Sequence, residues 1–280
     1  MLIKSALTFI LFFFNSYLTP SVLLEADARS EVRGDCYIEN NCFKDGEELR
    51  YNVYFNWGLL WLSAAEVVFK VDERPSGYYI TARGKTYKSY EWLYQVDDRY
   101  EVMVDKKTLL PLWSIKHAQE NDYHRYEKMV YNQDSKMVTS YEGPDEKNIT
   151  TKVVSINECA HDILSIFYFM RNYEYNTFRS GKTIDINLFL DRKMNYLKAK
   201  YDGNVNNKVI KDLGVYNTFR ISPETIEGQM FSSKKGSYMY VSRDNNQIPL
   251  LIESKLSVGS VKVVLNSVKN LRYPLTSRVK

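Results

Sequence analysis

The sequence predicts a mainly β fold, either a highly curved antiparallel sheet or an incompletely closed β-barrel, with one buried central helix. Apolar and polar residues alternate with a period of two over many short segments, which is typical of strands with one buried face. The chain has 23 Tyr and 13 Phe beside only 12 Gly, and aromatic residues suit half-buried pleated surfaces. One central segment is apolar on almost all sides, as expected of a helix inside a sheet.

The first 28 residues have the build of a secretory signal peptide. Lys4 supplies the positive charge, and the apolar run Leu7 to Phe14 is far shorter than the ~20 apolar residues of a membrane span. Ala26-Asp27-Ala28 fits the small-x-small pattern of signal peptidase. We therefore expect cleavage after Ala28 and a periplasmic location, with an uncleaved membrane anchor as the alternative. Residues 29–280 would then form a single β-rich domain.

The alternation predicts a run of strands on each side of the central helix, separated by turn-forming residues such as Pro75-Ser76-Gly77. The first two strands should form an antiparallel hairpin around Gly58-Leu59, with Trp57 and Trp61 on its inward face. The predicted strands are 47–57, 61–71, 78–87, 93–104, 112–118, 123–131, 137–141, 183–191, 195–201, 208–213, 215–221, 238–242, 248–254 and 258–268.

The helix is predicted over residues 158–172. Ser155 and Glu158 have the spacing of a capping box at its start. Because the segment is apolar almost all round, it should plug or back the curved sheet, with Arg171 and Asn172 at its exposed end.

The three cysteines suggest one disulfide. Cys36 and Cys42 are close enough in sequence to close a short loop, and an exported protein meets oxidising conditions. We expect a Cys36–Cys42 bridge, which leaves Cys159 as a small buried thiol.

Composition and motifs favour a non-enzymatic role without settling the question. The formal net charge is +4 and the charges are interspersed, which gives no support to nucleic-acid binding and is compatible with a weak peripheral contact with an anionic membrane. Cys159 and His161 would diverge by about 200° on a helix, so they cannot act as nucleophile and base together. His117 and His124 match no metal-ligand spacing, and no phosphate-binding or hydrolase motif occurs, so we expect no metal, no cofactor and no catalytic residues.

The tryptophans are the candidate ligand-binding residues. Large aromatic side chains are most often part of the core, but they also line pockets for apolar ligands. The four candidates are Trp57, Trp61, Trp92 and Trp113.

The segment from Cys36 to Asn41 resembles versions, from Bacteroidetes-type bacteria, of an uncharacterised family of exported proteins, domain of unknown function 3108. Three longer stretches resemble the same family. They are Phe43-Lys44-Asp45-Gly46-Glu47-Glu48-Leu49-Arg50-Tyr51, the segment from His161 to Arg171, and the segment from Val241 to Leu250. The resemblance covers nearly all of the mature chain. It implies a build similar to the lipoprotein-carrier (LolA/LolB-like) half-barrels, in which a curved sheet surrounds an apolar cavity.

Three functions follow as hypotheses. The first is non-enzymatic binding of a lipid or another apolar envelope component inside the sheet. The second is a structural or interaction protein with a packed interior, which docks a protein partner at a strand edge. The third is a hydrolase that acts on envelope glycan or lipid.

Overall fold

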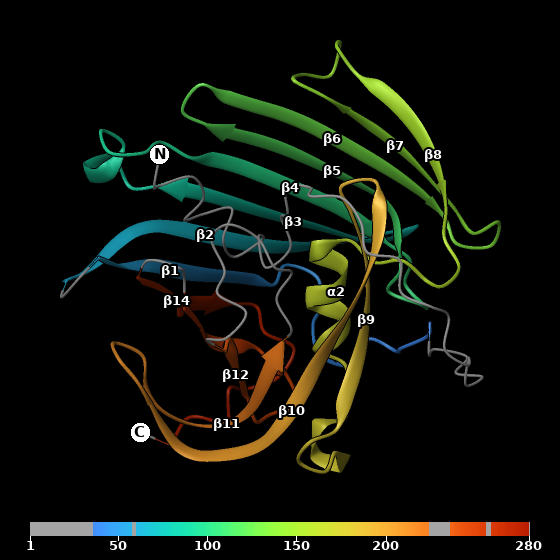
Figure 1. Cartoon of the computed structure of the whole chain (residues 1–280). Coiled ribbons are helices and arrows are strands. Elements are labelled where there is room, and N and C mark those ends of the chain that lie inside the picture. Colours follow the sequence, from blue (N-terminus) through green and yellow to red (C-terminus); the bar gives the residue numbers. More distant parts are fainter. Residues whose placement is uncertain (1–35, 58–59, 224–235, 256–258, 280) are drawn as a thin grey trace.

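The structure is a computed structural model that describes residues 36–57, 60–223, 236–255 and 259–279. The predicted signal peptide and its cleavage site lie outside these ranges. Within them, fourteen strands form one sheet in the order β8-β7-β6-β5-β4-β3-β2-β1-β14-β13-β12-β11-β10-β9 (Figure 1). The strands are Glu48–Trp57 (β1), Leu60–Arg74 (β2), Gly77–Thr86 (β3), Asp97–Val104 (β4), Pro111–Glu120 (β5), Tyr123–Asn132 (β6), Met137–Gly143 (β7), Thr150–Ser155 (β8), Thr183–Leu190 (β9), Lys193–Ile210 (β10), Gly214–Pro223 (β11), Tyr238–Ser242 (β12), Pro249–Lys255 (β13) and Ser260–Lys269 (β14).

The sheet consists of two antiparallel meanders joined in the middle. The strands β1 to β8 follow one another in space, as do β9 to β14, and β14 returns to pair with β1. The two edge strands, β8 and β9, are consecutive in the chain and are linked through the helix α2 (Ile163–Met170). Figure 1 shows the sheet curving around α2. Among the described residues no ladder joins β8 to β9, so the predicted curved, incompletely closed sheet with a central helix is confirmed.

The core fills the concave side of the sheet. Leu49, Tyr51 and Val53 of β1 are buried, as the alternation predicts, and they pair with the neighbouring β14, whose Val263 is also buried. Buried side chains of α2, among them Leu164, join the same apolar cluster. No helix within the described ranges has the length and apolar character needed to cross a bilayer.

The inward placement of Trp61 is wrong. Val53 pairs with Ala65, but the next residue, Tyr54, pairs with Ser63, so Ala64 is an extra residue on β2. A one-residue bulge moves every following side chain to the other face. Trp61 therefore lies on the convex side, 40% exposed. The side chain of Trp57 lies outside the described residues.

The helix is shorter than predicted and begins later. Asp162 is its N-cap and forms a capping box with Ser165, instead of the predicted pair Ser155 and Glu158. The residues before it are extended because His161 pairs with Leu188 of β9, which fixes this segment as a strand-like bridge.

The observed strands differ from the predicted ones in three further places. The segment from 93 to 96 is not strand, and a short 3-10 helix, η1 (Lys88–Tyr90), precedes β4. The segments 195–201 and 208–213 belong largely to the single long strand β10. The strand β8 was not predicted, since nearly all its side chains are exposed and it has no buried face that would produce an alternation.

The predicted Cys36–Cys42 disulfide is wrong. Cys36 is bridged to Cys159 across a sequence separation of 123 residues, with their Cα atoms 5.8 Å apart. Cys42 is a buried free thiol. The reason is local: the Asn40 side-chain oxygen accepts hydrogen bonds from the backbone N–H groups of Cys42 and Phe43, and this turn directs the Cys42 Sγ toward the Arg171 carbonyl oxygen, 2.8 Å away.

Thiol labelling tests this pairing. When the protein is denatured without reductant and labelled with a maleimide, we expect one label, on the peptide that contains Cys42. The Cys42→Ser variant should take none, and Cys159→Ser should take two because it frees Cys36. A single label on the Cys159 peptide would contradict the pairing.

Candidate functional site

A small apolar cavity lies between α2 and the strands β12 and β13. Its volume is about 90 Å³ and it is partly enclosed. Apolar side chains make up nearly the whole lining, and the polar exceptions are Arg171 and Gln247. The lining residues are Phe69, Ile163, Leu164, Ile166, Phe167, Met170, Arg171, Tyr175, Ile186, Pro223, Met239, Val241, Gln247, Pro249 and Ile252.

Aromatic packing helps to set the position of the helix beside this cavity. The ring of Phe167 on α2 stacks on Phe69 of β2, with centroids 4.9 Å apart and an angle of 8° between the planes. On the adjacent position of the helix, the Tyr168 ring meets Phe43 edge-on at 4.9 Å. These contacts place α2 against the first meander, while the cavity separates it from part of the second.

A buried ion pair lies at the end of α2. The Arg171 Nη1 and Nη2 atoms donate to the two carboxylate oxygens of Glu47 at 2.6 and 3.0 Å. The Arg171 Nε and Nη2 atoms also donate to the Asn246 carbonyl oxygen at 3.2 and 3.1 Å. Both charged side chains are buried, with exposed fractions of 2% for Arg171 and 0% for Glu47. The predicted exposure of Arg171 and Asn172 is therefore wrong, because the helix end is docked and not open to solvent.

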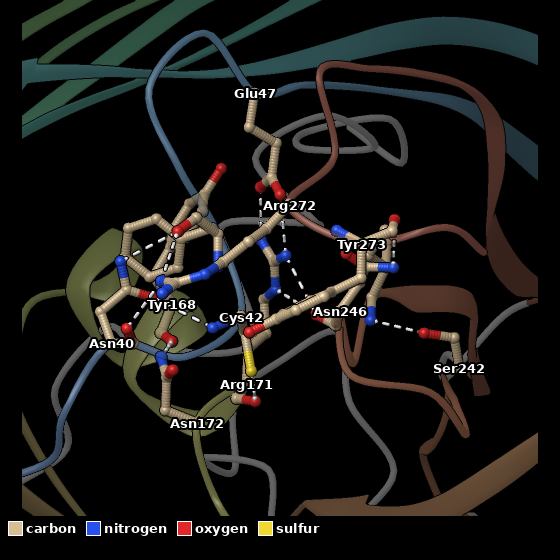
Figure 2. Close-up of polar contacts among 12 residues, drawn as sticks. Asn40, Cys42, Glu47, Tyr168, Arg171, Asn172, Ser242, Asn246, Arg272 and Tyr273 are labelled. Atoms are coloured by element: carbon tan, nitrogen blue, oxygen red, sulfur yellow. Dashed lines mark hydrogen bonds and ion pairs between the residues drawn. The ribbon is translucent and has the colours of Figure 1, made fainter. Parts of the chain in front are cut away.

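The surrounding hydrogen bonds connect four parts of the chain (Figure 2). The Arg171 carbonyl oxygen accepts hydrogen bonds from the Cys42 thiol and the Gln247 side-chain amide. The Asn246 side-chain amide donates to the carbonyl oxygen of Tyr273, and its side-chain oxygen accepts from the Tyr273 backbone N–H, both at 3.0 Å. The N-terminal segment, the helix, the turn between β12 and β13 and the C-terminal segment thus meet at one point. We call this set of contacts the Arg171 junction.

The Arg171 junction suits a structural task. Burial opposes the charge of Arg171, but the Glu47 carboxylate outweighs it and raises the pKa of the guanidinium further. Burial also raises the pKa of the Cys42 thiol, which keeps it protonated and a poor nucleophile. The bidentate pair of Glu47 and Arg171 is therefore a fixed frame at one end of the cavity.

The junction unites the three stretches that carry the family resemblance. Glu47 comes from the first stretch, Arg171 closes the second, and Asn246 lies in the third. This pair was not predicted from the sequence. The available signal was an arginine directly after an apolar helix and a glutamate directly before a strand whose alternating face is buried.

His161, Asp162 and Ser165 form a second buried polar group. Burial lowers the pKa of His161 to about 3, so the ring is neutral, and its Nδ1 lies 3.2 Å from the Ser165 Oγ. Burial raises the pKa of Asp162 to about 6. The Asp162 carboxylate accepts a hydrogen bond from the Ser165 backbone N–H at 2.7 Å, which is a helix cap and not a contact to the histidine.

A charged cluster joins the two halves of the sheet near the turn between β9 and β10. The Arg192 Nε lies 3.1 Å from the Glu142 carboxylate on β7, and its Nη2 donates to the Thr150 carbonyl oxygen at 2.6 Å. Arg125 binds the same carboxylate at 3.0 Å. Side-chain contacts thus connect the edges at this end of the opening, where no strand ladder does so among the described residues.

The structure does not gather the candidate tryptophans into one site. None of the three described tryptophan side chains lines the cavity. Trp61 lies on the convex face, Trp92 is 81% exposed in the loop between β3 and β4, and Trp113 lies beside Tyr79 with ring centroids 6.0 Å apart. Within the described ranges, no group of three or more His, Cys, Asp or Glu side chains is arranged to hold a metal ion.

The chain belongs to the family described as "Protein of unknown function (DUF3108)", whose model matches residues 50–266. The resemblance drawn from the three sequence stretches is thereby confirmed. No curated protein matches this chain.

Three solved structures are similar to this chain over most of its length. The crystal structure of a β-barrel-like protein of domain of unknown function DUF1849 from Brucella abortus aligns with a TM-score of 0.52 and 7% identity, covering 83% of this chain and 98% of that chain. A protein from Bacteroides fragilis, described as exported and with a YmcC-like fold, aligns with a TM-score of 0.31 and 12% identity, covering 84% of this chain and 99% of that chain. A protein from Parabacteroides distasonis, described as a lipoprotein, aligns with a TM-score of 0.30 and 11% identity, covering 82% of this chain and 100% of that chain. The first likeness shows a shared β-barrel-like fold.

The opposite pKa shifts of His161 and Asp162 predict a pH effect on stability. The pKa of His161, about 3, lies below its ordinary value, so this group binds fewer protons in the folded chain than in the unfolded chain. Its contribution to stability therefore increases as pH rises toward about 6.5. The pKa of Asp162, about 6, lies above its ordinary value, so its contribution falls as pH rises from about 4 to about 6. The two trends oppose each other in the native protein.

The Asp162→Asn variant keeps a side chain that can cap the helix. It removes the fall in stability with rising pH that comes from the Asp162 carboxyl group. Relative to the native protein, its free energy of unfolding should rise by about 1 kcal/mol per pH unit between about pH 4 and about pH 6. Urea unfolding at several pH values measures this difference. Parallel pH profiles of the two proteins would contradict a buried carboxyl group with a raised pKa.

Proposed function

We propose that this is an exported, non-enzymatic binding protein that holds the end of an acyl chain, or a similarly slender apolar group, in the cavity beside α2. The signal-peptide pattern in residues 1–28 supports export to the periplasm. The apolar cavity is the observation that carries the proposal.

The size and lining of the cavity define the ligand class. A volume of about 90 Å³ exceeds the ~10–15 Å³ that one water molecule needs and is well below the ~300 Å³ at which pockets take drug-sized ligands. Enclosed apolar cavities stay dry and bind apolar groups, and the lining of this partly enclosed cavity is mostly of the same apolar kind. The ligand should therefore place a narrow hydrocarbon end between α2 and the strands, with the rest of the molecule outside.

The rigid surroundings explain why such a space persists. Protein interiors are close-packed, and the groups around a void relax part of the way into it. Here α2 is fixed by its stacked ring contact with β2 and by the Arg171 junction at its end. A preformed cavity lowers the cost of binding because less chain has to be ordered.

The polar groups near the helix support a binding role over catalysis. His161 is neutral and buried, Asp162 caps α2, and Glu47 is bound to Arg171 in a bidentate pair. Each of these groups has a structural task.

One observation favours the second hypothesis, an interaction protein. The edge strand β8 is almost fully exposed, and its Val153 is 54% exposed. An exposed strand edge can pair with a strand of a partner. The interior next to it is largely packed, which is the other feature expected of such a protein.

A fluorescent fatty acid, cis-parinaric acid, tests the proposed function with the mature protein. Met239 lines the cavity and is half-buried, so Met239→Trp should fill the space and weaken binding by about tenfold or more. Met194 is also half-buried but lies outside the cavity, in a separate small cluster, so Met194→Trp is the matched control and should bind like the native protein. Two results would contradict ligand binding in the cavity: no saturable fluorescence with the native protein, or equal affinity of the native protein and Met239→Trp. Either result would leave the strand-edge hypothesis.

A further inference from the structure

Exposed aromatic and aliphatic side chains gather at one end of the sheet. The loop between β3 and β4 carries Trp92 and Leu93, which are 81% and 37% exposed. Trp61 on β2 and Tyr123 at the start of β6 are each 40% exposed. We call these four residues the aromatic rim.

Backbone contacts place the aromatic rim at a single end. The Tyr87 N–H donates to the Ala64 carbonyl oxygen at 3.0 Å, which puts the start of the loop beside the part of β2 that leads to Trp61. The Asn121 N–H in the turn between β5 and β6 donates to the Gln95 carbonyl oxygen at 2.9 Å, which puts that turn beside the end of the loop. Figure 1 shows the loop with its short helix projecting from the sheet on the same side as the turn between β5 and β6.

The loop satisfies its own polar groups although it is exposed. The indole N–H of Trp92 donates to the Ser89 carbonyl oxygen at 2.9 Å, so the ring presents an apolar surface outward. Backbone N–H groups also bond within the loop, from Tyr90, Glu91, Leu93 and Tyr94. A polar group that enters an apolar medium without a hydrogen bond is costly. Here these donors are already paired before any contact is made.

The loop is also held in place. The Tyr94 hydroxyl donates to the Glu120 carboxylate at 2.8 Å, and the Gln95 N–H donates to the Asn121 side-chain oxygen at 2.8 Å. Because the tip is ordered in advance, little conformational entropy is lost when it meets a surface.

We propose that the aromatic rim inserts into the interfacial layer of a phospholipid membrane and docks the protein there. Trp and Tyr side chains favour the level of the lipid headgroups, where one side is apolar and the other wet. The rim shares no residue with the cavity, so this proposal stands independently of the proposed function.

Charge has a minor role in this contact. Lys88 is exposed in the loop, but Glu91 in the same loop carries the opposite charge. Lys262, whose ammonium lies 4.6 Å from the Trp61 ring centroid, is paired with Glu253 at 2.9 Å. Apolar insertion should therefore dominate, and raised salt should leave most of the binding intact.

Cosedimentation with vesicles of phosphatidylethanolamine and phosphatidylglycerol tests the proposal. The mature native protein should pellet with the vesicles at low and at raised salt. Trp92→Ala should weaken binding by about tenfold or more because the most exposed ring is lost. The matched control is Tyr196→Ala, which removes an aromatic ring that is 56% exposed on β10, outside the rim, and it should bind like the native protein. Circular dichroism confirms that each variant is folded.

Three results would overturn the proposal. The native protein could stay in the supernatant, or Trp92→Ala could pellet as well as the native protein. In the third, the native protein would form a dimer in sedimentation velocity that Trp92→Ala dissociates, which would make the rim a contact between two copies of the chain.

Discussion

A carboxylate and a guanidinium, both shielded from water, meet where four segments of the chain cross. Moving either ion out of water costs several kcal/mol, and that cost is offset only when geometry and hydrogen bonding are nearly complete. The pair of Glu47 and Arg171 meets these conditions: the contact is bidentate, and the Nε and Nη2 atoms of Arg171 also donate to the Asn246 carbonyl oxygen. The pair thereby ties the end of α2 to the start of β1 and to the turn between β12 and β13.

This constraint matters because the sheet does not close on itself. Fourteen strands of the described chain form a curved surface whose edges, β8 and β9, have no ladder between them. An open curved sheet needs something to fill and brace its concave side. The helix α2 supplies that filling, the Cys36–Cys159 bridge fixes the segment that leads into it, and Arg192 connects the two halves at the opening. The cavity persists beside α2 because the helix is held at both ends.

Elements whose buried residues recur with a regular spacing could be predicted from the sequence. The alternation in β1 correctly placed Leu49, Tyr51 and Val53 in the core, and the all-round apolar helix was correctly placed inside the sheet. The prediction from the sequence failed where the pairing of strands overrides the local pattern. The extra residue at Ala64 turned Trp61 to the outside, and β8 gave no signal because neither of its faces is buried.

The candidate site could not be predicted from the sequence for a related reason. Partner choice depends on distance in space, and the ion pair joins residues separated by 124 positions. Local spacing favoured Cys36–Cys42, whereas the fold brings Cys36 to Cys159. The three family-like stretches contained the members of the Arg171 junction, but their order along the chain did not show that they meet.

A double-mutant cycle on Glu47 and Arg171 measures how strongly the buried pair stabilises the fold. Urea unfolding would compare the native protein with Glu47→Gln, Arg171→Met and the double variant. If the pair governs the fold, each single variant should lose about 3–5 kcal/mol because it leaves the other charged group buried without its partner. The double variant should lose clearly less than the sum, with a coupling energy of about 2 kcal/mol or more. Single losses below about 1 kcal/mol that simply add would contradict the account.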